Sequence, residues 1–301
     1  MATANTQLIP NNLWVSYHSA QGPRPNNEDW LGGYAPGDPR WQSAKGGCFV
    51  VADGFGGQRA GEIASRAAGE TVLGAYFRLP VSDLTQELAT SVLAANRRVS
   101  ELAAHYTGLR GMASTVVALA IRGGEAAVAH MGDSRAYLLR GDVVYALTKD
   151  HSWVQRLVDG RVISPAEAAA HPYRNIVTRY AGMGAAGAPD VRRFHLQAGD
   201  ALLLCSDGLS DRLPAAELRR LIDGPRQRDP APLLTRRAVR LGARDNASAI
   251  VIRYLPPAAF APAVRPAVSG VACEGLLPAM LVGGALAIGA AAFTALLAAL
   301  L

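Results

Sequence analysis

Acidic side chains occur in four widely separated segments of this chain, each at the end of an apolar run or of an arginine-led loop. The segments, in chain order, are RPNNED, FVVADGFGG, LLLCSDGLSD and GARDNAS. Carboxylates that fold into one place repel one another and raise one another's pKa values unless cations lie between them. Oxygen-only ligand sets suit hard divalent ions such as Mg²⁺ and Mn²⁺. The pattern therefore predicts a fold that gathers strand ends around a divalent-metal centre, which is what a metal-dependent hydrolase needs.

Composition permits a sizeable core and argues against a nucleic-acid partner. The chain has 301 residues, 50% of them hydrophobic, and its net charge of +6 is spread without long basic runs. The cysteines at positions 48, 205 and 273 form no CxxC pair, which favours a reducing compartment. The first residues, MATANTQLIPNN, lack the basic and apolar regions of a signal peptide. We therefore expect no nucleic-acid binding and no export signal.

Short β-rich runs and two long helical runs predict a mixed α and β fold. Long helices are expected at 58–78 and 82–106, and shorter ones at 153–158, 165–170, 214–222 and 232–241. Strands are expected at 14–19, 48–52, 114–121, 126–131, 136–140, 191–196, 201–205 and 249–254. Short glycine turns such as RGGE and LRGD are typical of antiparallel hairpins. Because the long helices fall together between strands, we expect antiparallel sheet with helices on its faces, not a doubly wound parallel sheet.

The composition changes after the last expected strand. Residues 1–12 are interpreted as an N-terminal tail, 13–254 as the catalytic domain, 255–275 as a Pro/Ala-rich linker and 276–301 as a transmembrane helix. Residues 276–301 contain no charged side chain and could cross a hydrocarbon core of about 30 Å. Arg253 and Arg265 precede this segment, which predicts a single-pass protein of the inner membrane with its catalytic domain in the cytoplasm. A buried core helix or the oligomerisation helix of a soluble enzyme is the alternative.

The candidate metal ligands lie in turns at strand ends. Asp53 ends an apolar run, and the following Gly54 offers its carbonyl oxygen as a second ligand. Asp207 and Asp245 border apolar runs in the same way, and Asp133 lies in the short connection HMGDSR. Each of these segments alone is more often a simple turn. Their combination is what indicates a site.

The loop RPNNEDW adds an arginine to these acids. The planar guanidinium of Arg24 can match phosphate oxygens, and Glu28 and Asp29 follow it in the loop. A solvated loop with an ion pair is the alternative for this segment alone. Strand-end acids combined with a loop arginine are nevertheless typical of a metallo-phosphoesterase.

Six motifs follow one another along the chain. They are Arg-x-x-x-Glu-Asp at 24–29, Asp-Gly-x-Gly-Gly at 53–57, Gly-Asp-Ser-Arg at 132–135, Thr-x-Asp-His-Ser at 148–152, Ser-Asp-Gly-Leu-x-Asp at 206–211 and Asp-Asn-x-Ser at 245–248. In this order they resemble the metal-dependent protein phosphatases of type 2C, over about residues 14–254. The resemblance implies two packed, mainly antiparallel sheets flanked by helices, with a two-metal centre at one end.

The resemblance also implies how the metals are held. Asp53 would bridge two ions, Glu28 and the Gly54 carbonyl would help hold one of them, and Asp207 and Asp245 would help hold the other. The implied cofactor is Mn²⁺ or Mg²⁺.

Other residues of the motifs would act around these ions. Arg24 would bind the substrate phosphate, and it would be catalytic together with Asp53 and Asp207. Asp133 with Asp207 would hold a third, weaker ion. Asp29 and Asp211 would orient waters on the metals.

The implied reaction is hydrolysis of phosphoserine and phosphothreonine in proteins by a metal-bridged hydroxide, and the implied partner is an opposing Ser/Thr kinase. Many eukaryotic relatives have a histidine, proposed as the leaving-group acid, where this chain has Phe55. His151 is expected to fix local structure. The segment 152–189 is expected to form a flap beside the site. Two alternatives to a protein phosphatase are a catalytically silent phosphoprotein-binding module and a hydrolase of small phosphate esters.

Overall fold

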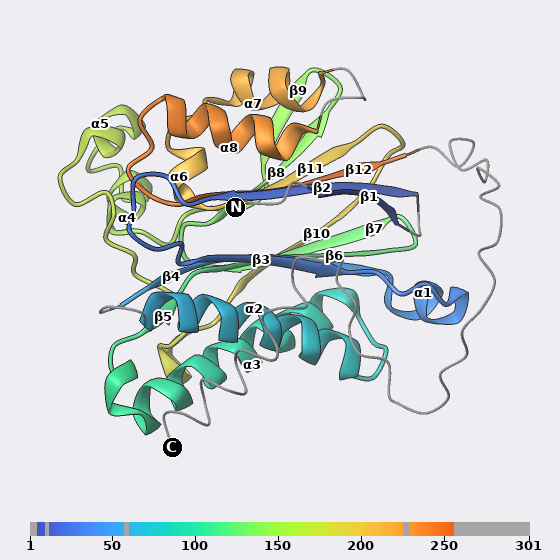
Figure 1. Ribbon diagram of the computed structural model, residues 1–301, viewed down its shortest axis with the longest axis horizontal. Coiled ribbons are helices and arrows are strands. Elements are labelled where there is room, and N and C mark those ends of the chain that lie inside the picture. Colours follow the sequence, from blue (N-terminus) through green and yellow to red (C-terminus); the bar gives the residue numbers. More distant parts are fainter. Residues whose placement is uncertain (1–4, 10–11, 57–59, 225–228, 256–301) are drawn as a thin grey trace.

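The fold consists of two antiparallel sheets stacked face to face, with helices on both outer faces (Figure 1). The computed structural model describes residues 5–9, 12–56, 60–224 and 229–255. The first sheet has the order β1 (Asn5–Ile9), β2 (Leu13–Ala20), β12 (Ala247–Tyr254), β11 (Ala201–Cys205), β8 (Arg135–Arg140) and β9 (Val143–Ala146). The second has the order β10 (Asp190–His195), β7 (Glu125–Met131), β6 (Val116–Arg122), β4 (Gly47–Phe55) and β3 (Asp29–Tyr34), and β5 (Ala113–Ser114) pairs with β4.

Some helices cover the outer faces of this sandwich, and others lie at its two ends. α2 (Ala60–Arg78) and α3 (Leu84–His105) cover the second sheet, while α7 (Ala215–Ile222) and α8 (Pro230–Arg240) cover the first (Figure 1). The short helices α4 (Trp153–Asp159), α5 (Pro165–Ala170) and α6 (Asp207–Ser210) gather at one end, where β4 also ends. α1 (Pro39–Lys45) lies at the opposite end. The expected sandwich with flanking helices is confirmed.

Alternating side chains of the central strands fill separate apolar layers. In β4, Phe49 and Val51 face the layer between the sheets, while Cys48 and Val50 face α2 and α3. β11 repeats this alternation between the middle layer and the layer under α7 and α8. A strand covered on both faces needs apolar residues at every position. This double burial explains the continuous runs CFVVA and ALLLC, whose ends deliver acids to the end of the sandwich.

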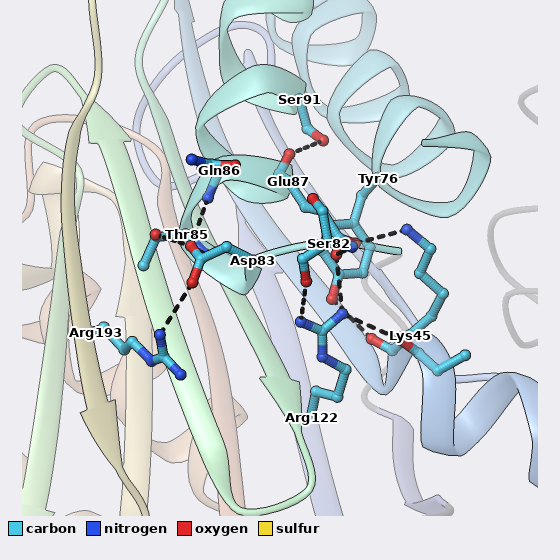
Figure 2. Close-up of polar contacts among 11 residues, drawn as sticks. Lys45, Tyr76, Ser82, Asp83, Thr85, Gln86, Glu87, Ser91, Arg122 and Arg193 are labelled. Atoms are coloured by element: carbon cyan, nitrogen blue, oxygen red, sulfur yellow. Dashed lines mark hydrogen bonds and ion pairs between the residues drawn. The ribbon is translucent and has the colours of Figure 1, made fainter. Parts of the chain in front are cut away.

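A buried charged cluster ties α1 to α3 at the end of the sandwich away from the strand-end acids. Figure 2 shows Glu87 of α3 between Lys45 and Arg122, with Lys45 Nζ 2.6 Å from Glu87 Oε2 and Arg122 Nη1 2.9 Å from Oε1. The side chains of Lys45 and Glu87 are each 1% exposed. Asp83 is the N-cap of α3 and accepts hydrogen bonds from the Thr85 and Gln86 amides. This agrees with the helix expected at 82–106.

Several elements differ from the expectations. The segment interpreted as an N-terminal tail contributes β1, and the expected strand 114–121 is divided into β5 and β6. The strand β3, the helices α1 and α6, and β9 were not expected. In β3 the sequence Gly-Gly suggests a turn, but a Cβ at Gly32 would lie 2.5 Å from the Trp30 ring, so the glycine makes room for that side chain.

The predicted linker and transmembrane helix lie outside the described residues. Within the part of the chain that the structure describes, no helix combines the length and the apolar character needed to cross a membrane.

Candidate metal centre

One hollow at the end of the sandwich brings most of the predicted site residues together. It encloses ≈ 350 Å³, and its lining includes Arg24, Glu28, Asp53, Gly54, Asp133, Asp207 and Asp245. They come from the loop before β3, the end of β4, the β7–β8 connection, the start of α6 and the loop before β12. Of the predicted residues, Asp29 and Asp211 do not line this hollow. The convergence that the sequence required is therefore present.

Backbone and hydroxyl contacts fix the end of β4. The Asp53 amide donates to Thr115 Oγ1 at 2.9 Å, and the Thr115 amide donates to the Asp53 carbonyl at 2.8 Å. Thr115 Oγ1 also lies 2.7 Å from Ser134 Oγ, next to Asp133. These bonds leave the Asp53 carboxylate free to point into the hollow while its backbone is held.

Asn246 lies just before β12 and holds the arginine-led loop, residues 24–29, against the start of that strand. Its side chain accepts from the Glu28 amide at 2.8 Å and donates to the carbonyls of Gln21 and Asn26 at 2.7 and 3.0 Å. Asn246 is 2% exposed. It thereby places Glu28 beside Asp245, although both belong to loops.

Two glycines allow Glu28 to approach the end of β4. A Cβ at Gly54 would lie 1.9 Å from the Gly61 carbonyl oxygen, and a Cβ at Gly61 would lie 2.6 Å from Glu28 Oε1. Real side chains cannot occupy these positions without moving their neighbours. The contact between β4 and α2 is thus part of how the hollow is built.

Asp29 lies behind the hollow, directly opposite Asp53 in the β3–β4 pairing. Its Oδ2 accepts hydrogen bonds from Ser206 and Ser248, both at 2.7 Å, whereas its buried Oδ1 has no hydrogen-bond partner among the described residues. The two serines belong to the motifs that carry Asp207 and Asp245. Asp29 therefore connects both of those motifs to β3.

The acids of the cluster hold their protons unusually tightly. Loss of water raises the pKa of Asp53 well above its usual range, and repulsion by Asp29, Asp207, Asp133 and Asp245 adds to the shift. Desolvation and repulsion between carboxylates likewise raise the pKa values of Asp29 to about 7, Asp133 to about 8 and Asp207 to about 6. Desolvation is the first cause in each case.

The donor set fits hard divalent cations. It consists of carboxylate and carbonyl oxygens, and Asp207 Oδ1 is buried without a hydrogen-bond partner among the described residues. Arg24 pairs with Asp245, and one guanidinium cannot balance this many carboxylates. Divalent ions among these oxygens would remove the mutual repulsion that adds to the effect of desolvation on the pKa values.

Asp211 lies in a neighbouring hollow of ≈ 600 Å³ that also contains Asp133 and Asp207. The Arg135 guanidinium lies 3.5 Å from Asp211 Oδ1 and binds Asp150 through two hydrogen bonds of 2.8 and 2.6 Å. Sequence reasoning missed Asp150, although it stands beside His151 in the motif Thr-x-Asp-His-Ser.

His151 fixes the turn that carries Asp133. The Gly132 amide donates to His151 Nδ1 at 3.2 Å, and the His151 amide donates to the Gly132 carbonyl at 3.0 Å. His130, His151 and Asp190 form a further group of possible ligands, with ligand atoms within 4.8 Å of one another. In this group His130 Nε2 is 2.8 Å from the Lys149 carbonyl, and Arg179 pairs with Asp190. These contacts favour a structural role for the histidines, as expected for His151.

The segment 152–189 leaves the sandwich beside the hollow and carries α4 and α5. Ser152 caps α4, and Ser164 with Glu167 forms a capping box at α5. The Phe55 ring meets the Tyr180 ring edge to face, at 5.3 Å between centroids. Phe55 therefore joins the end of β4 to the base of this segment.

Sequence reasoning identified the acids but missed several residues that position them. Thr115 and Ser134 bond to each other beside Asp53, and nothing in the spacing of their segments indicated this contact. Asn246 directly follows Asp245, and that position was the available signal. Its three bonds to another loop could not be read from a local turn pattern.

Comparison with known proteins agrees with this architecture. The family model described as "Protein phosphatase 2C" matches residues 35–248. The serine/threonine protein phosphatase PstP of Mycobacterium tuberculosis is 36% identical over 207 residues, covering 67% of this chain and 39% of the relative, so the chain spans well under half of that protein's length. The protein phosphatase PhpP of Streptococcus pneumoniae is 35% identical over 235 residues, covering 76% of this chain and 92% of the relative.

A solved structure shares the fold. The catalytic domain of PstP in complex with two manganese ions superimposes with a TM-score of 0.70 at 32% identity, covering 81% of this chain and 99% of that one. Sequence motifs, sheet order and the converging acids all lead to the same assignment. The chain belongs to the protein phosphatase 2C family.

Proposed function

We propose that this protein is a Mn²⁺- or Mg²⁺-dependent serine/threonine protein phosphatase. The observation that carries the proposal is the single hollow lined by Arg24, Glu28, Asp53, Asp207 and Asp245. The pKa values of Asp53 and Asp207 are raised there by desolvation first and then by repulsion between carboxylates. The names of the relatives support the substrate class: PstP is called a serine/threonine protein phosphatase.

The proposed residue roles follow from where the side chains lie. Asp53 lies at the end of β4 in the hollow that Glu28, Asp207 and Asp245 also line, and it is repelled by Asp29 first and then by Asp207, Asp133 and Asp245. In this proposal Asp53 would help hold both ions, Glu28 and the Gly54 carbonyl would help hold one of them, and Asp207 and Asp245 would help hold the other. Such ions supply Lewis-acid chemistry, acidifying water and neutralising charge on phosphoryl oxygens.

We propose that Arg24 binds the substrate phosphate. Its guanidinium lines the hollow at the loop edge, is about half exposed, and pairs with Asp245. An incoming phosphate offers it two acceptor oxygens in place of that carboxylate. Phe55, which the Tyr180 ring contacts, has no proton to give, so it serves as a wall and not as an acid.

We further propose that residues 276–301 tether the enzyme to the inner membrane, with the catalytic domain in the cytoplasm. The support is the absence of charge in this segment and the arginines that precede it. Its substrates would then be phosphoproteins at the membrane surface, and a Ser/Thr kinase would oppose it.

Phosphate release from a phosphothreonine peptide by the full chain tests the activity. We expect release with Mn²⁺, none with a chelator, and none from Asp53→Asn with Mn²⁺ present. Asp142→Asn, at a side chain that is 89% exposed, is the matched control and should keep full activity. A metal-loaded chain that binds the peptide without releasing phosphate would instead be a binding module. Turnover confined to small esters would identify a different phosphoesterase.

A further inference from the structure

A second hollow adjoins the metal centre and is larger than it. This hollow has a volume of ≈ 600 Å³ and is called the flap pocket. It lies between α6 and the α4–α5 part of segment 152–189. It shares Asp133, Asn175 and Asp207 with the ≈ 350 Å³ hollow. A peptide whose phosphorylated residue enters the smaller hollow can therefore place a neighbouring side chain in the flap pocket, because each residue of an extended peptide advances about 3.3 Å.

Two arginines of the flap pocket act electrostatically on one shared acid, Asp211, without forming a salt bridge to it. Arg174 and Arg212 both line it and are partly buried, and neither forms an ion pair with any residue that the structure describes. Arg135, by contrast, is bound by Asp150 through two hydrogen bonds. A partly desolvated guanidinium that has no direct salt-bridge partner gains from an anion that binds there.

The acids of the flap pocket do not cancel these two charges. Asp150 is matched by Arg135, while Asp133 and Asp207 face the metal centre. Asp211 is then the remaining carboxylate. Arg135 lies 3.5 Å from it, and the charges of Arg174 and Arg212 act on the same group. The two positive charges of Arg174 and Arg212 therefore exceed the single negative charge of Asp211.

The remaining wall is apolar. Val154 and Val158 of α4 and Pro165 and Ala168 of α5 line the same pocket. A side chain with an aliphatic stem and an anionic end matches this combination, since its stem can cover the aliphatic wall while its end reaches the arginines.

We propose that the flap pocket binds an anionic side chain, a carboxylate or a second phosphate, located close to the phosphorylated residue of the substrate. The proposal rests on the proposed phosphatase function and specifies which phosphoproteins it favours. Arg174 and Arg212 are the specificity-determining residues, and they act on substrate binding rather than on the chemical step.

Steady-state kinetics of the full chain in mild detergent with Mn²⁺ test this. The substrates are phosphothreonine peptides that carry glutamate, glutamine or a second phosphothreonine at each of the nearest positions on either side. We expect the KM for the best-placed glutamate or phosphothreonine peptide to be about tenfold below that of its glutamine counterpart. Comparing the two anionic peptides shows whether carboxylate or phosphate is preferred.

The variants assign the effect to the pocket. Arg174→Ala combined with Arg212→Ala should remove the preference by raising KM for the anionic peptides alone, with kcat and turnover of a small phosphate ester unchanged. Arg98→Ala, at an exposed position of α3, makes a matched charge change away from the pocket and should keep the preference. Arg174→Lys combined with Arg212→Lys should keep part of the preference.

The outcomes separate this inference from the proposed function. Equal KM values for glutamate and glutamine peptides at every position, with normal turnover, would overturn the flap pocket and leave the phosphatase assignment standing. A preference that survives the double arginine variant would also overturn it. Absence of turnover on every phosphopeptide would overturn both proposals.

Discussion

At the scale of single residues, the site is built from groups that are unfavourable without a cation. Asp29 Oδ1 and Asp207 Oδ1 are buried without hydrogen-bond partners among the described residues. Asp53 lies among four other carboxylates that raise its pKa. The fold therefore holds these acids together at a cost in stability, and bound metal would recover that cost.

Stability of the metal-free protein should depend on pH through these acids. The pKa of Asp207 rises from 3.8 to about 6, through desolvation first and then repulsion by Asp211 and Asp245. The folded state thus binds this proton more tightly than the unfolded chain does. Its contribution to stability is complete below pH 3.8 and is lost as the pH rises through about 6.

Asp207→Asn removes that loss. In the presence of a chelator at about pH 7, we expect the variant to be more stable than the wild type by roughly 1–3 kcal/mol, and to be stabilised less by Mn²⁺ than the wild type is. Thermal unfolding across this pH range with and without Mn²⁺ measures both effects. The exposed control Asp142→Asn should follow the wild type. A chelated Asp207→Asn protein with the wild-type pH slope would contradict this account.

At the scale of elements, the site depends on how closely α2 approaches β4. Gly61 lies near the start of α2 and Gly74 in its last third. A Cβ at Gly61 would lie 2.6 Å from Glu28 Oε1 and 2.8 Å from the Gly54 carbonyl oxygen. A Cβ at Gly74 would meet the flexible end of Arg78, at 2.9 Å from Nη2. The same helix therefore contains a glycine that shapes the site and one that does not.

Gly61→Ala and Gly74→Ala should differ in their effect on Mn²⁺ binding. Gly61→Ala displaces the Glu28 carboxylate, so we expect at least about tenfold weaker Mn²⁺ binding by titration calorimetry. Gly74→Ala should leave Mn²⁺ affinity unchanged and raise stability by about 0.5–1 kcal/mol, because alanine loses less backbone entropy in a helix. Equal Mn²⁺ affinities for both variants would show that the α2 contact does not position Glu28.

The buried contact between α1 and α3 makes a second element-scale test. In Lys45→Met, Glu87 keeps Arg122 but loses the partner at its other oxygen, so we expect a loss of about 3 kcal/mol in the free energy of unfolding. Denaturant unfolding measures this, and phosphatase activity at low temperature should be unchanged.

The chain offers a matched control, because Lys149 is its other lysine. Lys149 pairs with Asp159 at the surface, with side chains 61% and 43% exposed. Lys149→Met should change stability by less than about 0.5 kcal/mol. Similar losses for the two variants would mean that burial of the Lys45–Glu87 pair does not set its contribution.

At the scale of the whole molecule, the last strand of the two described sheets ends before the uncharged C-terminal segment begins. β12 ends at Tyr254, and the Leu255 amide donates to the Asn12 carbonyl at 2.7 Å. Every residue assigned to the metal centre and to the flap pocket precedes this point. The catalytic fold and the proposed tether are thus separate parts of the chain.

A protein ending at residue 255 should keep full activity. We expect its kcat/KM on a phosphothreonine peptide to match that of the full chain, and we expect it to leave the membrane fraction. The full chain should remain in the pellet after a carbonate wash. Loss of turnover on truncation would place the domain boundary elsewhere, and release of the full chain by carbonate would contradict the tether.

The sequence by itself determined the acids, the arginine and the kind of strand that carries them. Apolar runs such as CFVVA and ALLLC predict doubly covered strands, and the polar residues that end them must lie at the rim of a core. Helix periodicity and the cap residue Asp83 were equally local signals. These features could be predicted because they depend on neighbours within a few residues.

Tertiary structure alone decided which of these groups meet and what holds them. Asn246 forms hydrogen bonds to a loop more than two hundred positions earlier in the chain. The absence of a side chain at Gly61 leaves space for Glu28, and its absence at Gly32 leaves space for the Trp30 ring in β3. The pairing of Arg135 with Asp150, beside which Arg174 and Arg212 share the single acid Asp211, is of the same kind. Such contacts join residues distant in the chain, and their energies depend on burial and approach distances that exist once the sheets have packed.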